Sequence, residues 1–146
     1  MKLTGKLTAI LIVLFSISTK AQISSITGEW QTVDDKSGEI RALVNIFRAN
    51  DGMYYGKIEK MYKYADAVCI LCEGKNKGQP VLGMMIIRQM KADGNELKGG
   101  SILDPETGKE YYVTISYDAK AGKLKLRGSL DKRGIFGRNQ YWIKPN

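Results

Sequence analysis

Two β-rich runs joined by a single turn fill residues 96–117, which read Glu96-Leu97-Lys98-Gly99-Gly100-Ser101-Ile102-Leu103-Asp104-Pro105-Glu106-Thr107-Gly108-Lys109-Glu110-Tyr111-Tyr112-Val113-Thr114-Ile115-Ser116-Tyr117. Asp104 opens the turn, Pro105 has a preset φ, and Gly108 can adopt a positive φ, a pattern typical of a type I turn closed by a bulge. In the second run, every other residue belongs to one large apolar or aromatic face, made of Tyr111, Val113, Ile115 and Tyr117. The stretch therefore predicts an antiparallel hairpin.

The same alternation of a short β-rich run with turn residues extends through the chain. We predict strands over 28–33, 40–48, 53–61, 81–91, 96–103, 110–117, 123–130 and 135–143. Tight turns such as Asn50-Asp51-Gly52 and Asp93-Gly94-Asn95 separate several of them. We find no helical periodicity after the first 21 residues. Eight antiparallel strands with short connections most simply close into an up-and-down barrel, so we expect one all-β domain over residues 22–146.

The N-terminus resembles a cleavable signal peptide over residues 1–21. Lys2 and Lys6 precede an apolar run over residues 7–17, and the small residues Thr19 and Ala21 suit cleavage after Ala21. The run is shorter than the roughly 20 residues that a spanning helix needs. We therefore expect an exported protein, periplasmic or secreted, of 125 residues (146 minus 21) and without a membrane span.

The charge and the residue types restrict the function. Loss of three lysines with the signal leaves 20 basic and 15 acidic residues, a net charge of +5, with the excess at the C-terminal end. That end can favour an anionic lipid, glycan or peptide, but alternation of its lysines with leucines better fits the solvent face of a strand. We expect no nucleic-acid partner, because no recognition motif is present.

The chain has no histidine. This absence rules out Ser-His-Asp triads, Cys-His pairs and histidine-based zinc sites. Two carboxylates that face each other across a cleft can cleave a glycoside. The candidate pairs here, Asp34/Asp35 and Asp104/Glu106, both lie in predicted turns instead. We therefore predict no catalytic residue, no metal site and no cofactor, and an enzyme is the less favoured class.

The two cysteines, Cys69 and Cys72, occur in the run Cys-Ile-Leu-Cys within the longest predicted irregular stretch, 62–80. A redox centre normally places such a pair at the start of a helix, which lowers the pKa of one thiol. The residues after Cys72 are turn-like instead. We favour a disulfide that shapes the loop, with a redox centre or sensor as the alternative and a metal site as a remote third.

Aromatic and methionine side chains near this loop suggest a ligand site. A barrel of eight strands is either filled by side chains or holds one small ligand. We predict that the loop covers a mouth of the barrel and that a small apolar or amphipathic ligand would contact Tyr54, Tyr62, Tyr64 and Met84. Filling of the core by these side chains is the simpler alternative for each of them.

Several motifs in a fixed order resemble one bacterial family. They are Gly28-Glu29-Trp30, Tyr55-Gly56-Lys57-Ile58, the Cys-Ile-Leu-Cys run, residues 99–111, Leu126-Arg127-Gly128 and Gly137-Arg138-Asn139-Gln140-Tyr141-Trp142. Over residues 28–144 the chain resembles the domain of unknown function 2147 family. The resemblance implies a small exported protein, commonly with this cysteine pair, and no established activity. The chain departs from the family after Gly128, where Ser-Leu-Asp-Lys-Arg replaces a shorter link, so we expect a longer hairpin there.

A weaker resemblance is to lipocalin-like barrels, which also begin with a Gly-x-Trp strand. It implies that Trp30 pairs with an arginine of a late strand, here Arg138, by a cation–π contact at one end of the barrel. We assign structural roles to Gly28, Trp30, Asp104, Pro105, Gly108 and Arg138. The leading functional hypothesis is a non-enzymatic exported barrel that binds a small ligand or a cell-envelope component. A thiol-disulfide protein and a purely structural envelope protein are the alternatives.

Overall fold

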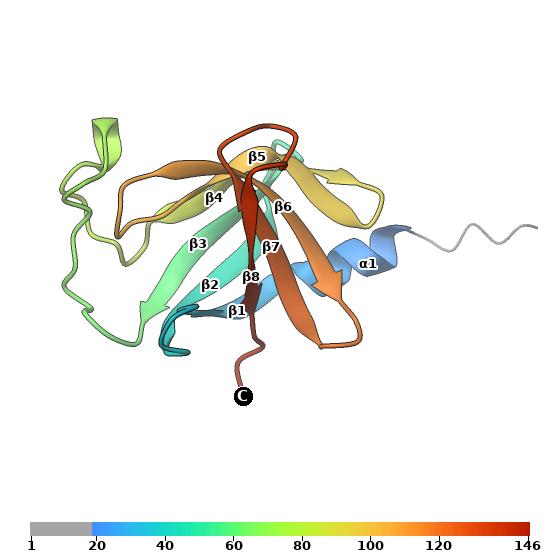
Figure 1. Cartoon of the computed structure of the whole chain (residues 1–146), viewed down its shortest axis with the longest axis horizontal. Coiled ribbons are helices and arrows are strands. Elements are labelled where there is room, and N and C mark those ends of the chain that lie inside the picture. Colours follow the sequence, from blue (N-terminus) through green and yellow to red (C-terminus); the bar gives the residue numbers. More distant parts are fainter. Residues whose placement is uncertain (1–18) are drawn as a thin grey trace, which may run out of the picture.

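Eight antiparallel strands in sequence order form the fold in the computed structural model, which describes residues 19–146 (Figure 1). The elements are α1 (Thr19–Ile26), β1 (Gly28–Val33), β2 (Ile40–Arg48), β3 (Tyr54–Met61), the 3-10 helix η1 (Gly74–Asn76), β4 (Met85–Asp93), β5 (Glu96–Leu103), β6 (Glu110–Asp118), β7 (Lys123–Ser129) and β8 (Gly137–Trp142). Each strand pairs with its neighbour in sequence, so every connection is a hairpin or a longer loop of the same kind. Among the described residues, no helix is long and apolar enough to cross a membrane.

The sheet curls into a nearly closed barrel whose seam lies between β1 and β8. At the seam, Gln31 and Ile143 exchange two backbone hydrogen bonds, with N···O distances of 2.8 and 3.1 Å. The other seven strand pairs have extended ladders. The barrel thereby protects most of the backbone groups that an open edge would expose.

The interior is filled by the alternating apolar residues of the strands. One face of each strand supplies buried side chains that form a single cluster, among them Trp30, Val44, Ile46, Ile58, Ile87, Met90, Leu97, Ile115, Leu124 and Trp142. Period-two alternation is the reason, since successive side chains of a strand point to opposite faces of the sheet. Within residues 19–146, the interior of the barrel is thus filled by side chains and does not form an open ligand cavity.

Helix α1, which immediately precedes β1, also contributes side chains to this core. Its Ile23 and Ile26 are buried in the cluster, and the helix contacts β5 and β6. The Trp30 Nε1 donates a hydrogen bond of 2.7 Å to the carbonyl oxygen of Ile26. This bond satisfies a carbonyl of the last helical turn, which has no partner within the helix.

The predicted fold is confirmed: the domain is an all-β antiparallel barrel of eight strands. The strand bounds agree closely, although β4 begins at Met85 rather than at 81 and β8 begins at Gly137 rather than at 135. Our expectation of no helix beyond the first 21 residues was wrong, because α1 runs from Thr19 to Ile26. Only one turn of α1 carries its buried isoleucines, too short a stretch for helical periodicity to be visible. The predicted signal-peptide run, 7–17, lies outside the described residues.

Candidate functional site

The longest connection in the barrel is the segment between β3 and β4, residues 62–84, which we name the clasp loop. It stands off the side of the barrel opposite α1, with the short helix η1 near its tip (Figure 1). All of the other connections are shorter. The clasp loop is therefore the part of the fold with the most freedom to carry a binding surface.

A disulfide joins Cys69 and Cys72 within the clasp loop, with a Cα–Cα distance of 5.3 Å. Both side chains are buried in the main core cluster, at 0% and 3% exposure. The loop also folds back on itself, since the Cys69 N–H donates to the Gln79 carbonyl and the Gly78 N–H donates to the Cys69 carbonyl, each at 2.8 Å. In the chain-entropy model a four-residue ring contributes only about 2 kcal/mol. The bond therefore fixes local shape more than it stabilises the barrel.

The disulfide segment sits directly on the β5–β6 turn. The Cys69 Sγ lies 3.3 Å from the carbonyl oxygen of Pro105. A Cβ placed on Gly108 would lie 2.0 Å from the carbonyl oxygen of Leu71 and 2.9 Å from the backbone nitrogen of Cys72. Gly108 also has a φ of +70°. Backbone packs on backbone here, and only a glycine leaves enough space for it.

Aspartate organises this turn. The Asp104 carboxylate accepts hydrogen bonds from the Glu106 N–H (3.0 Å) and the Thr107 hydroxyl (2.9 Å). The Asp104 N–H donates to the Lys109 carbonyl, and the Gly108 N–H donates to the Asp104 carbonyl, both at 2.8 Å. The turn chemistry read from the sequence thus builds a rigid platform, and the clasp loop rests on it.

Two further contacts hold the ends of the clasp loop to the barrel. At its start, Lys63 hydrogen-bonds and ion-pairs with Glu39 of the β1–β2 turn. This bond holds the pKa of Glu39 below its ordinary value. At its end, the Gly83 N–H donates to the Ile58 carbonyl (2.9 Å), and the Ile58 N–H donates to the Met84 carbonyl (3.0 Å). The loop is anchored at its base, its middle and its exit.

Asp34, a second acidic residue of the β1–β2 turn, also has a lowered pKa. The Ser37 N–H donates to the Asp34 carboxylate at 2.8 Å, and this bond is the main reason that the pKa of Asp34 is lowered. Arg41 lies between these acids, 3.6 Å from Asp34 and from Glu39. The carboxylates here are occupied by turn hydrogen bonds and ion pairs, an arrangement that stabilises turns.

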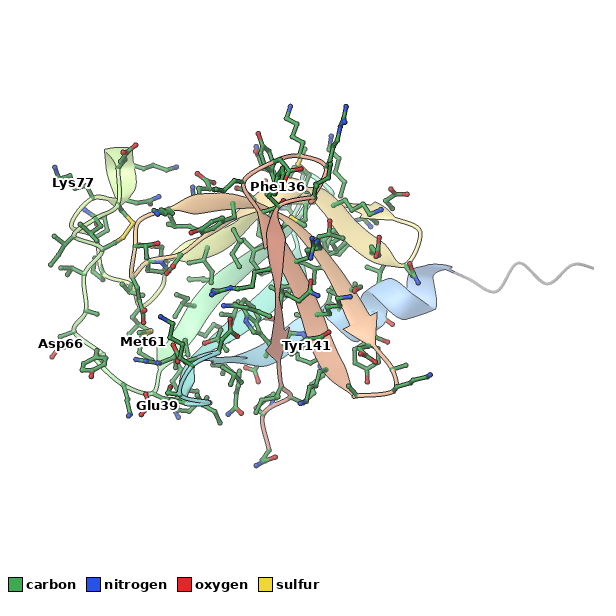
Figure 2. All side chains as sticks on the ribbon, in the orientation of Figure 1. Glu39, Met61, Asp66, Lys77, Phe136 and Tyr141 are labelled. Carbon is green, nitrogen blue, oxygen red and sulfur yellow. A yellow bond between two sulfur atoms is a disulfide. The ribbon has the colours of Figure 1, made fainter. Side chains whose placement is uncertain are left out.

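The clasp loop exposes several large apolar side chains among charged ones such as Glu73 and Lys75. Tyr64, Ile70 and Leu71 are 72%, 71% and 62% exposed, and Val68 and Leu82 are exposed as well. Residues 64–68 together with Ile70 line a hollow of about 550 Å³. Figure 2 places Asp66 and Lys77 on this protruding segment, away from the barrel. An anchored loop that exposes apolar side chains beside charged ones is suited to contact an apolar or amphipathic partner.

The four residues predicted to contact a ligand do not share one surface. Tyr64 alone borders the hollow. The Tyr62 hydroxyl accepts a hydrogen bond of 2.9 Å from the Gln31 side chain, and Met84 is buried in the core. Tyr54 lies at the opposite end of β3 from Tyr62. An extended strand rises roughly 3.3 Å per residue, so the two residues are about 26 Å apart. Residues at both ends of a strand cannot line a single mouth of the barrel.

The cation on Trp30 is a lysine rather than the predicted arginine. The Lys144 Nζ lies 4.0 Å from the centroid of the Trp30 ring. Arg138 is exposed and ion-pairs with Asp35 at 3.5 Å. The prediction of a Trp30–Arg138 contact is corrected accordingly, because Arg138 lies near the β1–β2 turn whereas Trp30 lies inside the barrel. Gly28, with a φ of +106°, starts β1 beneath Lys144.

Two features of the site had no visible signal in the sequence. One is the contact between Gly108 and Leu71, which depends on how a 23-residue loop returns to the barrel. The other is Ile70 and Leu71 as exposed residues between two buried cysteines. An apolar pair between cysteines would ordinarily be assigned to the core.

These observations define a class: a small antiparallel barrel with a filled interior and one long disulfide-bonded loop that exposes apolar side chains. The chain belongs to the family described as uncharacterized protein conserved in bacteria, DUF2147, whose model matches residues 28–144. A solved structure of similar fold is protein HP1028 from the human pathogen Helicobacter pylori, which is described as belonging to the lipocalin family. The two chains are 22% identical, the TM-score is 0.70, and 83% of each chain is covered. A search of curated proteins found no match.

Proposed function

We propose that the protein is an exported, non-enzymatic barrel that binds an apolar or amphipathic component of the cell envelope on the outer side of its clasp loop. One observation carries this proposal: Tyr64, Ile70 and Leu71 are exposed on an anchored loop beside a hollow of about 550 Å³. The barrel interior is filled by buried side chains, so the ligand surface that we propose lies outside the barrel.

Rigidity of the loop supports this assignment. The disulfide, the β5–β6 turn and the Lys63–Glu39 pair fix the backbone while its apolar side chains remain in water. A surface that is ordered before binding loses less conformational entropy when it binds. A purely structural envelope protein would have the same barrel without a need for this apolar surface.

The thiol-disulfide alternative lacks comparable support. The sulfurs of Cys69 and Cys72 are buried, and η1, which follows them, is a single 3-10 turn of three residues. Disulfide exchange needs an attacking thiolate to reach one sulfur atom. We therefore propose a structural role for this bond.

Nile red, a neutral dye whose fluorescence rises in apolar surroundings, tests the proposed ligand surface. We expect the protein to enhance its fluorescence and the Ile70→Glu variant to lose about tenfold in affinity, because a carboxylate then occupies the apolar surface. Ala121→Glu, which introduces the same carboxylate at an exposed position of the β6–β7 turn, should bind the dye as the unchanged protein does. Equal loss in both variants, or no loss in either, would contradict the proposal.

Export is part of the proposal and predicts a specific mature chain. Cleavage after Ala21 would leave Gln22 at the N-terminus and retain Ile23 and Ile26, the two buried residues of α1. We expect the intact mass of the protein purified from its own host to correspond to residues 22–146. A mass that includes Met1, in a protein recovered from the cytoplasm, would refute export.

A further inference from the structure

The loop between β7 and β8, residues 130–136, presents three large apolar side chains to solvent. Leu130 is 72% exposed, Ile135 61% and Phe136 79%. Figure 2 shows Phe136 at the end of this loop, where β8 begins, far from the clasp loop. Single exposed apolar residues are common on proteins, but three of them within seven residues mark a candidate interaction surface.

The backbone of the β7–β8 loop is firmly held in this arrangement. The Asp131 carboxylate accepts hydrogen bonds from the Ile135 N–H (3.1 Å) and the Phe136 N–H (3.0 Å). The Arg127 guanidinium donates to the Gly134 carbonyl through Nε (2.9 Å) and Nη2 (2.6 Å). The Ser129 hydroxyl donates to the Asp131 carbonyl at 2.7 Å. The polar groups of the loop are thus satisfied on its inner side, and its apolar groups are left outside.

Positive charge surrounds the apolar tip. Lys132 and Arg133 lie on the loop itself, and both line a hollow of about 490 Å³ on the outer face of β5, β6 and β7. Lys98, Lys125 and Arg127 line the same hollow. Its one acidic residue, Glu96, lies 2.9 Å from the Lys98 Nζ and is neutralised by it. Within residues 19–146, Lys125, Lys132 and Arg133 have no carboxylate within ion-pair distance.

We propose that the β7–β8 loop docks on an anionic phospholipid surface. Leu130, Ile135 and Phe136 enter the boundary between headgroups and acyl chains, while Lys132 and Arg133 contact lipid phosphates. The adjacent hollow, with Lys125, receives a neighbouring headgroup. Apolar side chains beside cations are the combination that interfacial membrane binding requires. The proposal concerns a surface distinct from the clasp loop and does not depend on the function proposed for that loop.

The combination of cations and exposed apolar side chains favours a lipid surface over a soluble anion. A soluble anion would need only the cations of the hollow and would leave the three apolar side chains in water. A neutral apolar partner would need only those side chains and would leave Lys132 and Arg133 unpaired. A surface that carries negative headgroups above an apolar layer satisfies both sets at once.

Sedimentation with phosphatidylcholine vesicles, with and without phosphatidylglycerol, tests the proposal on the protein isolated from its host. We expect binding to the anionic vesicles that weakens as salt is added, because salt screens exposed charges. Ile135→Ser with Phe136→Ser should reduce partitioning about tenfold or more. Lys132→Gln with Arg133→Gln should also reduce it and should flatten its dependence on salt.

A matched pair at the β6–β7 turn, Lys120→Gln with Lys123→Gln, removes the same charge at exposed positions and should leave vesicle binding unchanged. Circular dichroism confirms that each variant is folded, which is expected because all of the altered side chains lie at the surface. Equal binding to neutral vesicles, or equal loss with the pair at the β6–β7 turn, would overturn the proposal. Release from vesicles by glycerol phosphate at low concentration would overturn it too, because the hollow would then be a site for a soluble anion.

Discussion

Gly108→Ala is expected to lower the free energy of unfolding by about 3 kcal/mol and to detach the clasp loop from the barrel. A φ of +70° costs an alanine roughly 1–2 kcal/mol. Its Cβ would also lie 2.0 Å from the Leu71 carbonyl oxygen, which requires one of the two backbones to shift. Overpacking of this kind typically costs about 1–3 kcal/mol. Urea denaturation followed by circular dichroism measures the total.

The β1–β2 turn provides a matched control for this variant. Asp34 to Gly38 repeats the geometry of Asp104 to Gly108: the Gly38 N–H donates to the Asp34 carbonyl at 2.8 Å, and Gly38 has a φ of +72°. Nothing lies within 4 Å of a Cβ placed on Gly38. Gly38→Ala should therefore lose only the conformational part, about 1–2 kcal/mol.

Detachment of the loop has a chemical readout of its own. The Cys69 and Cys72 sulfurs are buried where the loop rests on the turn, so dithiothreitol should reduce this disulfide faster in Gly108→Ala than in Gly38→Ala. Equal losses of stability together with equal reduction rates would show that the contact between Leu71 and Gly108 does not hold the loop.

Trp30→Phe is expected to destabilise the barrel by about 3 kcal/mol. The change removes the hydrogen bond from Nε1 to the Ile26 carbonyl and leaves that carbonyl buried without its donor, a loss of about 1–3 kcal/mol. It also leaves part of the indole volume empty within the core, which adds a cavity cost that depends on how far neighbouring side chains relax. Urea denaturation of the mature protein, followed by circular dichroism, measures the change.

Trp142→Phe is the control, because Trp142 is equally buried but its Nε1 has no hydrogen-bond partner among the described residues. This change removes an unpaired polar atom while it creates a similar cavity, so the two effects partly offset each other and the expected loss is about 1 kcal/mol. If both tryptophan variants lose the same stability, the bond from Trp30 to Ile26 contributes nothing measurable to the docking of α1.

Most of the barrel could be predicted from the sequence because strand patterns are local. Ala42, Val44 and Ile46 alternate with half-buried neighbours in β2, and the structure buries the same three residues. The turn that begins at Asp104 likewise forms through hydrogen bonds between residues no more than five positions apart. Signals of this range are contained in a short window of sequence.

The candidate site was less predictable because its contacts join distant parts of the chain. Tyr54, Tyr62, Tyr64 and Met84 were grouped by residue type and proximity in sequence, yet β3 separates Tyr54 from the other three along its length. The cation on Trp30 was assigned to Arg138, whereas the close approach of β1 and β8 at Gln31 and Ile143 brings Lys144 there instead. Only the closure of the barrel decides which of two nearby cations reaches the ring.

The sequence alone determined the class of fold, the order of the strands and the turns, since each rests on residues that are neighbours in the chain. Tertiary structure alone decided that Gly108 supports the clasp loop, that α1 closes the core through Ile23 and Ile26, and that apolar residues on two separate loops face water. The physical reason is burial: whether a side chain faces the core or solvent depends on what packs against it, and in a barrel the packing partner is usually far away in sequence.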